Sequence, residues 1–141
     1  MWIRNPLDLL FFEHSVLRIR YNVALSLLDR CEDEAFRILY ETHDFVINWH
    51  AKIEDEYFFP LYGEKAKPFH NYHLLIEKYG NSVIKERIKN WVPRYVKIVL
   101  DHNKNEEDIL FLLKINTDGL MEKILKEMEK YPKYFEITGL R

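Results

Sequence analysis

Two segments of the sequence carry a histidine followed four residues later by a glutamate. They are His50 with Glu54, in HAKIEDEYF, and His102 with Glu106, in HNKNEEDIL. On a helix, residues four apart lie on one face about one turn from each other, so each pair can direct an imidazole and a carboxylate to the same point. Both groups bind transition metals, and the shared spacing therefore predicts two matching halves of one metal site.

The elements that carry these pairs are predicted to be helices, because apolar residues recur at alternating spacings of three and four along most of the chain. No long stretch alternates apolar and polar residues as a half-buried strand would. Asn5 before Pro6 is typical of a helix start, and Asn90 before Pro93 predicts a second capped start. The predicted helices cover about residues 6–30, 36–60, 67–88 and 91–113, with a shorter one at 120–130.

The predicted fold is all-α: an up-down-up-down antiparallel four-helix bundle with an additional short C-terminal helix. Short connections make neighbouring helices antiparallel, which closes four of them around one core. A chain of 141 residues is of ordinary length for a single domain. We therefore expect one domain over residues 1–141, with the bundle at about 5–115 and the C-terminal helix and tail at 116–141.

Single histidines on the two remaining helices, His14 and His73, complete the predicted site. In an antiparallel pair, two residues at the same height are about equally far from the turn that joins their helices. The midpoint of His14 and His50 is residue 32, that of Glu54 and His73 is 63–64, and that of His73 and His102 is 87–88. All three midpoints lie in or beside predicted turns, so the four helices are expected to present these residues in one layer.

Such a layer would bury several polar groups together, and each unpaired one costs about 1–3 kcal/mol. Bound dications remove that cost, and imidazole with carboxylate but without thiolate suits iron or manganese and does not exclude zinc. We expect two metal ions as cofactors. The predicted ligands are His14 and His50 for one ion, His73 and His102 for the other, and Glu54 and Glu106 as bridges. The alternative is a metal-free helical interaction module whose polar layer only fixes helix register.

Several neighbouring residues have less certain roles. Glu107, five residues after His102, would replace Glu106 if a local helix bulge rotated it inward. His43 lies two turns from His50, about 10 Å by helix rise, and is interpreted as a core residue or a hydrogen-bond partner of the ligands. Four tyrosines are interpreted as core residues, with hydrogen bonding to the ligands or redox chemistry as the alternative: Tyr21, Tyr57, Tyr72 and Tyr95.

The chain resembles the hemerythrin-like, or HHE cation-binding, family over about residues 5–115. The resemblance rests on FEHSVLRI, HAKIEDEYFFP, YHLLIEK and HNKNEEDILF. It implies the four-helix fold and a non-haem di-iron site, with His73 as a ligand from the third helix. Oxygen-carrying members have a second ligand histidine one turn away on that helix, where this chain has Phe69 and Glu77. His70 is the residue that could take that place.

The resemblance and the short histidine set favour a di-iron protein that binds or senses O2, NO or peroxide, or handles iron, through open positions on its centre. The alternatives are a di-iron redox enzyme of the peroxidase or ferroxidase kind, or an iron donor like those that repair iron-sulfur clusters. Repair proteins usually carry an extra cysteine-bearing domain that this sequence lacks. We therefore expect a metal- and oxygen-binding protein rather than a dedicated catalyst.

Composition restricts the partners. The formal charge of −2 and the pI near 6.3 provide no basic field for nucleic acid. No apolar run approaches the roughly 20 residues that span a bilayer, and the first residues do not form a signal peptide, so we expect a cytoplasmic protein without a membrane partner. Cys31, the single cysteine, cannot form an internal disulfide. The expected partner is a small diatomic ligand or peroxide, for a monomer or homodimer.

Overall fold

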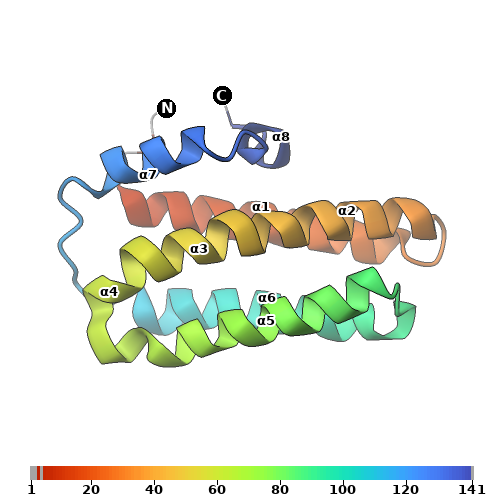
Figure 1. The fold of residues 1–141 in the computed structure, drawn as a ribbon. Helices are drawn as coiled ribbons and strands as arrows, with labels where there is room; N and C mark the ends of the chain where they lie inside the picture. The colour runs from red at the N-terminus through yellow and green to blue at the C-terminus, as the bar shows by residue number, and fades with distance from the viewer. Residues whose placement is uncertain (1–2, 4, 141) are drawn as a thin grey trace.

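The computed structural model describes residue 3 and residues 5–140, which form helices and connecting turns and contain no strand (Figure 1). The predicted all-α fold class is confirmed. The first half of the chain forms two long helical segments. The first is α1 (Pro6–Leu27), and the second runs through α2 (Glu32–Phe45), α3 (Ala51–Ile53) and α4 (Phe59–Tyr62) without leaving the helical path. Two π-helical turns, Val46–His50 and Glu54–Phe58, join the parts of the second segment.

The second half forms two further long segments and two short helices. A 3-10 turn at Gly63–Ala66 leads into α5 (Lys67–Lys85). A 3-10 turn at Lys89–Trp91 leads into α6 (Val92–Asn105), which continues as a π-helical turn at Glu106–Leu110. The chain then crosses to α7 (Leu120–Glu129) and α8 (Tyr134–Thr138), which lie beside the first half of the chain in Figure 1.

The helix starts follow local chemistry. Asn5 accepts a hydrogen bond from the Leu7 N–H at 2.9 Å and Pro6 takes the first helical position, as the sequence predicts. The second helix, by contrast, begins earlier than the predicted residue 36, because the acidic residues after Cys31 are part of it. Glu32 and its acidic neighbours form the first turn of α2, where the N–H groups of the helix end attract negative charge.

The predicted cap at Asn90 is wrong, because α5 ends in a different way. The Ile88 N–H bonds to the Val83 carbonyl at 2.9 Å and the Arg87 N–H bonds to the Ile84 carbonyl at 3.3 Å, which is a Schellman motif. Arg87 has φ 51°, the left-handed conformation that this motif requires. The chain therefore turns before Asn90, which lies inside the 3-10 turn, and α6 starts at Val92.

The four long segments lie side by side with their axes roughly aligned (Figure 1). Contacts join α1 to α2, α2 to α5, α5 to α6 and α6 back to α1, so the apolar faces of all four meet in one core. The helix α8 also contacts α1 and α2, and it buries Tyr134 completely. The sequence predicts only a tail there, because five residues are too few to show a helical period.

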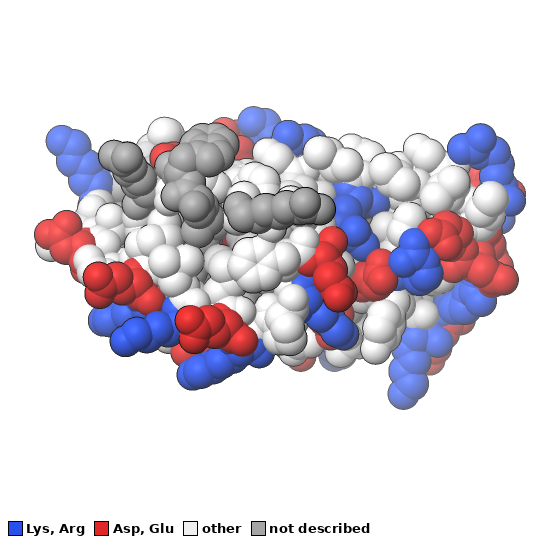
Figure 2. All heavy atoms as spheres, turned by 90° about the horizontal axis from the view of Figure 1, so that it is seen from above, with Lys and Arg blue, Asp and Glu red and all other residues white. Residues whose placement is uncertain are grey.

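The outer surface is mixed in charge. On the described part of the face in Figure 2, acidic and basic side chains lie next to one another. Ion pairs among the described residues include Arg37 with Glu41 at 2.9 Å. This agrees with the low net charge of the sequence. None of the helices among the described residues is both long and apolar enough to cross a membrane.

Candidate metal centre

The structure brings together all six residues that the sequence predicts as metal ligands. Their donor atoms form two groups, and within each group one atom from every residue lies within 4.8 Å of the others. The first group contains His14, His50, Glu54 and Glu106, and the second contains Glu54, His73, His102 and Glu106. All six residues are buried, with exposed fractions of 5% or less.

The two groups share both glutamates, while each has its own pair of histidines. His50 Nε2 lies 3.3 Å and His73 Nε2 lies 3.2 Å from the same oxygen, Glu54 Oε1. On the other side, Glu106 places Oε1 at 3.1 Å from His14 Nε2 and Oε2 at 3.3 Å from His102 Nε2. The arrangement thus has two imidazoles at each end and two carboxylates between them.

Although these atoms lie close together, most of them do not form hydrogen bonds with one another. Most of the buried side-chain atoms without a hydrogen-bond partner among the described residues belong to this cluster: His14 Nε2, His50 Nε2, His102 Nε2, and both carboxylate oxygens of Glu54 and of Glu106. Two atoms that each lie about 2.1 Å from one ion, at roughly a right angle, stand about 3 Å apart. The separations therefore fit atoms that face a common cation, and the donor set of imidazole and carboxylate fits a transition metal.

The π-helical turns lie at the residues that form the cluster. His50 ends one turn, Glu54 begins the next and Glu106 begins the third. A π turn adds one residue to the helical circuit and changes which side chains face inward, and such turns are frequent at functional sites. The bulge that the sequence analysis considered after His102 is therefore present. It starts at Glu106, and Glu106 rather than Glu107 joins the two groups.

Three of the four histidines hold a second carboxylate on their outer nitrogen. The Nδ1 pairs are His14 with Glu107 at 2.8 Å, His50 with Glu13 at 2.8 Å and His73 with Asp55 at 2.9 Å. When Nδ1 donates its proton outward, Nε2 carries a lone pair that points into the cluster. This arrangement fixes the imidazole tautomer and orientation, and it makes the ring a stronger metal ligand.

Glu13 is a functional residue that the sequence analysis missed. It is 1% exposed, and besides His50 it accepts hydrogen bonds from Trp49 Nε1 and from the Tyr134 hydroxyl, both at 2.9 Å. The signal was present in the sequence, where a lone acidic residue follows an apolar run in LLFFEH next to His14. Through Tyr134, the short C-terminal helix α8 helps to hold a carboxylate behind the candidate site.

His70 is not brought into either group. Its side chain is about half exposed, and its Nδ1 lies 3.0 Å from Asp55 Oδ1, the same oxygen that His73 contacts. Glu107 is likewise outside the two groups and contacts His14 from behind. Glu107 therefore lies one contact from the cluster, through His14, and His70 lies two contacts from it, through Asp55 and His73.

Charge interactions in the cluster are strong. Burial alone lowers the pKa of His50, but the charge of Glu54 and the hydrogen bond to Glu13 outweigh it and raise the pKa to about 10. Burial raises the pKa of Glu106, but the neighbouring His102 outweighs it and holds that pKa well below its usual range. The buried carboxylates thus demand positive charge, which protons on the histidines or bound cations can provide.

His43 and the four tyrosines that were predicted to be core residues do not all lie in the core. His43 is buried but lies outside both groups, and Tyr21 and Tyr95 are fully buried in the core. The core assignment is wrong for Tyr72, whose side chain is exposed and packs beside His102 with ring centroids 5.7 Å apart. Tyr57 is only partly buried and bonds to Glu127 on α7 rather than to the cluster.

The fold and the cluster together define a helical protein with buried histidine and glutamate groups that can hold metal ions. Comparison with known proteins adds no identity, because no family model, curated protein or solved structure matches the chain. The resemblance to the hemerythrin-like family therefore stays a prediction that rests on the motifs and their placement.

Proposed function

We propose that this protein binds two iron ions between its four long helical segments and uses them to bind or sense a small ligand such as O2, NO or peroxide. The observation that carries the proposal is the pair of donor groups that share Glu54 and Glu106. Two carboxylates placed between two pairs of imidazoles suit two ions a few ångströms apart, each with its own histidines.

We further propose that the fold is an antiparallel four-helix bundle of the hemerythrin-like kind. The ring of contacts among α1, α2, α5 and α6 supports this arrangement. The connections between successive segments are short, which favours antiparallel neighbours. In such a bundle, metal sites are built in the core from side chains on facing helices, which is where the two donor groups lie.

Iron is proposed because imidazole nitrogens and carboxylate oxygens suit iron or manganese, and because the four motifs resemble those of the hemerythrin-like family. Bound iron would supply redox chemistry and affinity for small diatomic ligands. The chain's contribution is to hold three of the four imidazoles, those of His14, His50 and His73, in one tautomer through outer carboxylates, and to keep the cluster buried. Each group offers four donors, fewer than an octahedral ion takes, which leaves room for an exogenous ligand.

Tyr62 supports the binding of such a ligand. Its hydroxyl is buried and has no hydrogen-bond partner among the described residues. Burial, and then the charges of Glu54 and Glu106, raise its pKa to about 12, so the O–H remains protonated at neutral pH. A buried donor close enough to feel both bridging carboxylates is suited to donate a hydrogen bond to an anionic ligand at the centre.

A redox enzyme of the peroxidase or ferroxidase kind is the second candidate. The observation that favours it is a buried pair of tyrosines, Tyr21 and Tyr95, which are hydrogen-bonded to each other at 2.6 Å on the same helices as His14 and His102. Tyrosine is a side chain that can donate single electrons. Turnover of peroxide with a reducing substrate would distinguish this candidate from a protein that only binds its ligand.

The test is metal analysis combined with optical spectroscopy. Protein purified natively, or reconstituted anaerobically with Fe(II), is expected to hold about two irons per chain, as the two donor groups require. Azide or O2 should then change the visible spectrum, because they bind the open positions. A spectrum that stays unchanged with both ions bound would contradict ligand binding, and iron that leaves readily to a chelator would favour the iron-donor alternative.

A further inference from the structure

A second polar layer lies one heptad away from the candidate metal centre. Each of its members is seven residues from a predicted histidine ligand, which is two helical turns or about 10 Å along the helix axis. The members are Tyr21 after His14, His43 before His50, Gly80 after His73 and Tyr95 before His102. Seven residues forward on one helix and seven residues backward on an antiparallel neighbour lead toward the same end of the molecule. The four residues therefore lie at one height.

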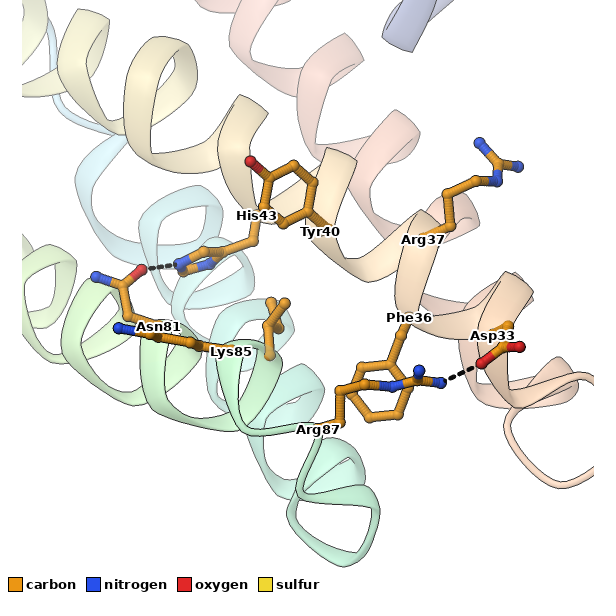
Figure 3. Close-up of a pocket in the computed structure, with 9 residues that line it drawn as sticks. Asp33, Phe36, Arg37, Tyr40, His43, Asn81, Lys85 and Arg87 are labelled. Atoms are coloured by element: carbon orange, nitrogen blue, oxygen red, sulfur yellow. Dashed lines mark hydrogen bonds and ion pairs between the residues drawn. The ribbon is translucent and has the colours of Figure 1, made fainter.

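The side chains of this layer are joined by short hydrogen bonds. The Tyr21 and Tyr95 hydroxyl oxygens are 2.6 Å apart, and the Tyr95 hydroxyl is 2.6 Å from His43 Nδ1. The other nitrogen of His43, Nε2, lies 2.8 Å from Asn81 Oδ1 (Figure 3). The chain of contacts thus runs from the middle of the core at Tyr21 to Asn81.

The direction of the hydrogen bonds follows from the available donors. The Asn81 oxygen can only accept, so His43 Nε2 donates to it and Nδ1 carries the lone pair. Burial lowers the pKa of His43, which keeps the ring neutral at neutral pH. The Tyr95 hydroxyl therefore donates to His43, and the Tyr21 hydroxyl donates to Tyr95. Tyr95 has a proton acceptor at 2.6 Å, in contrast to most buried tyrosines, which donate to a carbonyl or water.

Gly80 allows this close approach. A Cβ at this position would lie 2.3 Å from His43 Cε1 and 2.6 Å from Tyr95 Cε1. The backbone of α5 therefore packs directly on the imidazole and the phenol ring, which holds both in place. Any other residue here would separate the two rings from the helix.

Apolar side chains separate the two layers. Leu17, Val46, Ile76 and Val99 occupy the intermediate positions of the four helices, and all are buried. These buried apolar side chains offer no polar group that could carry a proton, so protons cannot pass through them from one layer to the other. Electrons can, because they tunnel through about 10 Å of packed protein without a chain of polar groups, and the helix rise sets the layers at that separation.

On its other side, the second layer reaches a groove between α2 and α5. His43 and Asn81 lie at the groove, whose rim is formed by Tyr40, Lys85 and Arg87 (Figure 3). The groove has a volume of about 700 Å3, which is enough for a small aromatic molecule. A reductant seated there would be next to His43 and one side chain from Tyr95.

We propose that Tyr95 is a redox-active tyrosine that relays single electrons between this groove and the metal centre. The proposal rests on the proposed function, because the oxidant is hydrogen peroxide. Its reduction to two molecules of water takes two electrons, supplied singly by two turns of the relay, and two protons from solvent. In the step, Tyr95 loses one electron and its O–H bond breaks, while the proton forms an N–H bond at His43 Nδ1. The products are a neutral tyrosyl radical and an imidazolium.

The reverse step restores the relay. A phenolic one-electron reductant in the groove supplies an electron to the radical and releases its own hydroxyl proton to solvent, and His43 returns the proton to the Tyr95 oxygen. Burial holds the pKa of Tyr95 well above its ordinary value, so the residue cannot lose its proton first. Electron and proton must leave together, and the hydrogen bond to His43 provides the path for the proton.

The experiment is electron paramagnetic resonance on iron-loaded protein that is frozen soon after addition of hydrogen peroxide. We expect a tyrosyl radical signal that Tyr95→Phe abolishes and that Tyr57→Phe leaves unchanged, because Tyr57 lies outside the groove and bonds to Glu127 on α7. Tyr21→Phe should keep the radical but alter its spectrum, because it removes the hydrogen bond to the radical oxygen. A signal that persists in Tyr95→Phe would overturn the assignment, as would the absence of any radical in protein that holds iron.

Two further measurements make the result independent of folding defects and of the proposed function. Incorporation of 3-fluorotyrosine at position 95 should add a fluorine splitting to the signal while the side chain keeps its hydroxyl. In metal-free protein, pulse radiolysis with azide radicals should place the longest-lived tyrosyl radical on Tyr95, and Tyr95→Phe should remove it. If the protein binds no iron but this radical forms, the proposed function fails and the redox character of Tyr95 stands. If iron binds and neither radical forms, the relay fails alone.

Discussion

The two polar layers of this protein lie one heptad apart, and they differ in whether their buried polar atoms have hydrogen-bond partners. In the layer of Tyr21, His43 and Tyr95, every hydroxyl and ring nitrogen has a hydrogen-bond partner at 2.6–2.8 Å. In the layer of Glu54 and Glu106, the carboxylate oxygens have no hydrogen-bond partner within residue 3 and residues 5–140, although both side chains are fully buried. The same four helices, with the same spacing, therefore produce one complete network and one incomplete one.

The difference indicates what each layer needs. A complete network is stable by itself and fixes the helix register, whereas unsatisfied buried carboxylates cost several kcal/mol unless a cation joins them. Carboxylates also surround the histidines of the incomplete layer from behind, through Glu13, Asp55 and Glu107. This surplus of carboxylates needs positive charge, which bound cations could provide. The contrast between the layers can be tested by changing one of them at a time.

The largest expected effect comes from a shared carboxylate. Glu54→Ala should abolish binding of both ions, because Glu54 belongs to both donor groups. His50→Ala and His102→Ala each remove a ligand from one group only and should lower the iron content to about one ion or less. Iron content measured by mass spectrometry checks this order, with Glu41→Ala on the outer surface as the control. Full iron content in either histidine variant would contradict the ligand assignment.

Removal of the metal should lower thermal stability. Ions present at about a thousand times their dissociation constant stabilise the fold by about 4 kcal/mol, which corresponds to a shift in Tm on the order of 10 °C. Calorimetry with and without a chelator measures the shift. The variant Tyr21→Phe alters only the complete layer and should show the same metal-dependent shift as the parent chain. Identical Tm values with and without chelator would mean that no ion contributes to the fold.

Gly80→Ala should damage the complete layer and spare the other. The new Cβ would overlap His43 and Tyr95, and overpacking of this kind costs about 1–3 kcal/mol. Chemical denaturation measures the loss, while the iron content should stay unchanged. The double variant Gly80→Ala with His43→Ala provides space for the methyl group, so its two effects should be less than additive. Strict additivity would show that the close packing on α5 is not responsible.

A smaller effect on metal binding is expected from Glu13, which contacts the outer nitrogen of His50. Glu13→Gln weakens the hydrogen bond that orients His50 and should reduce metal affinity by roughly 10–100-fold, the range found for outer partners of ligand histidines. Competition with a chromophoric chelator measures the affinity. Asp8→Asn, an exposed residue of α1, is the matched control. An affinity equal to that of the control would show that Glu13 serves packing through Trp49 and Tyr134 alone.

The smallest effect is a pH dependence of the complete layer. Burial depresses the pKa of His43 in the folded chain below its ordinary value of 6.5, and the hydrogen bond to Asn81 opposes this only in part. As the pH falls below 6.5, His43 becomes protonated in the unfolded chain but stays neutral in the folded chain. The free energy of unfolding therefore decreases. Nuclear magnetic resonance titration of His43 measures the pKa, and a value above 6.5 would reverse the sign and exclude a neutral acceptor for Tyr95.

Much of this organisation could be predicted from the sequence because it is periodic. The recurring apolar positions predict the helices, and equal distances from the turns predict that His14, His50 and His73 meet. Details that depend on tertiary contacts could not be predicted. The end of α5 at Arg87 is set by a backbone motif with no glycine to mark it, and α8 is stabilised by the burial of Tyr134 rather than by its own period.

The carboxylates behind the histidines were missed for a related reason. Glu13 and Asp55 are sequence neighbours of predicted ligands, so helical geometry places them on adjacent faces that look solvent-exposed in a single helix. Only the packing of other helices turns those faces inward, against Trp49 in one case and His73 in the other. For Glu13, a lone acidic residue beside an apolar run is the sequence signal, whereas Asp55 stands between Glu54 and Glu56 and has no such signal.

The central claim is that two cations lie between the four histidines and are joined by Glu54 and Glu106. The most direct test is a crystal structure of the iron-reconstituted protein with anomalous diffraction measured at the iron absorption edge. We predict two anomalous peaks a few ångströms apart, one beside His14 and His50 and one beside His73 and His102, with both glutamates in contact with both peaks. No anomalous peak in that layer, or a single one bound by the histidines of only one group, would contradict the account.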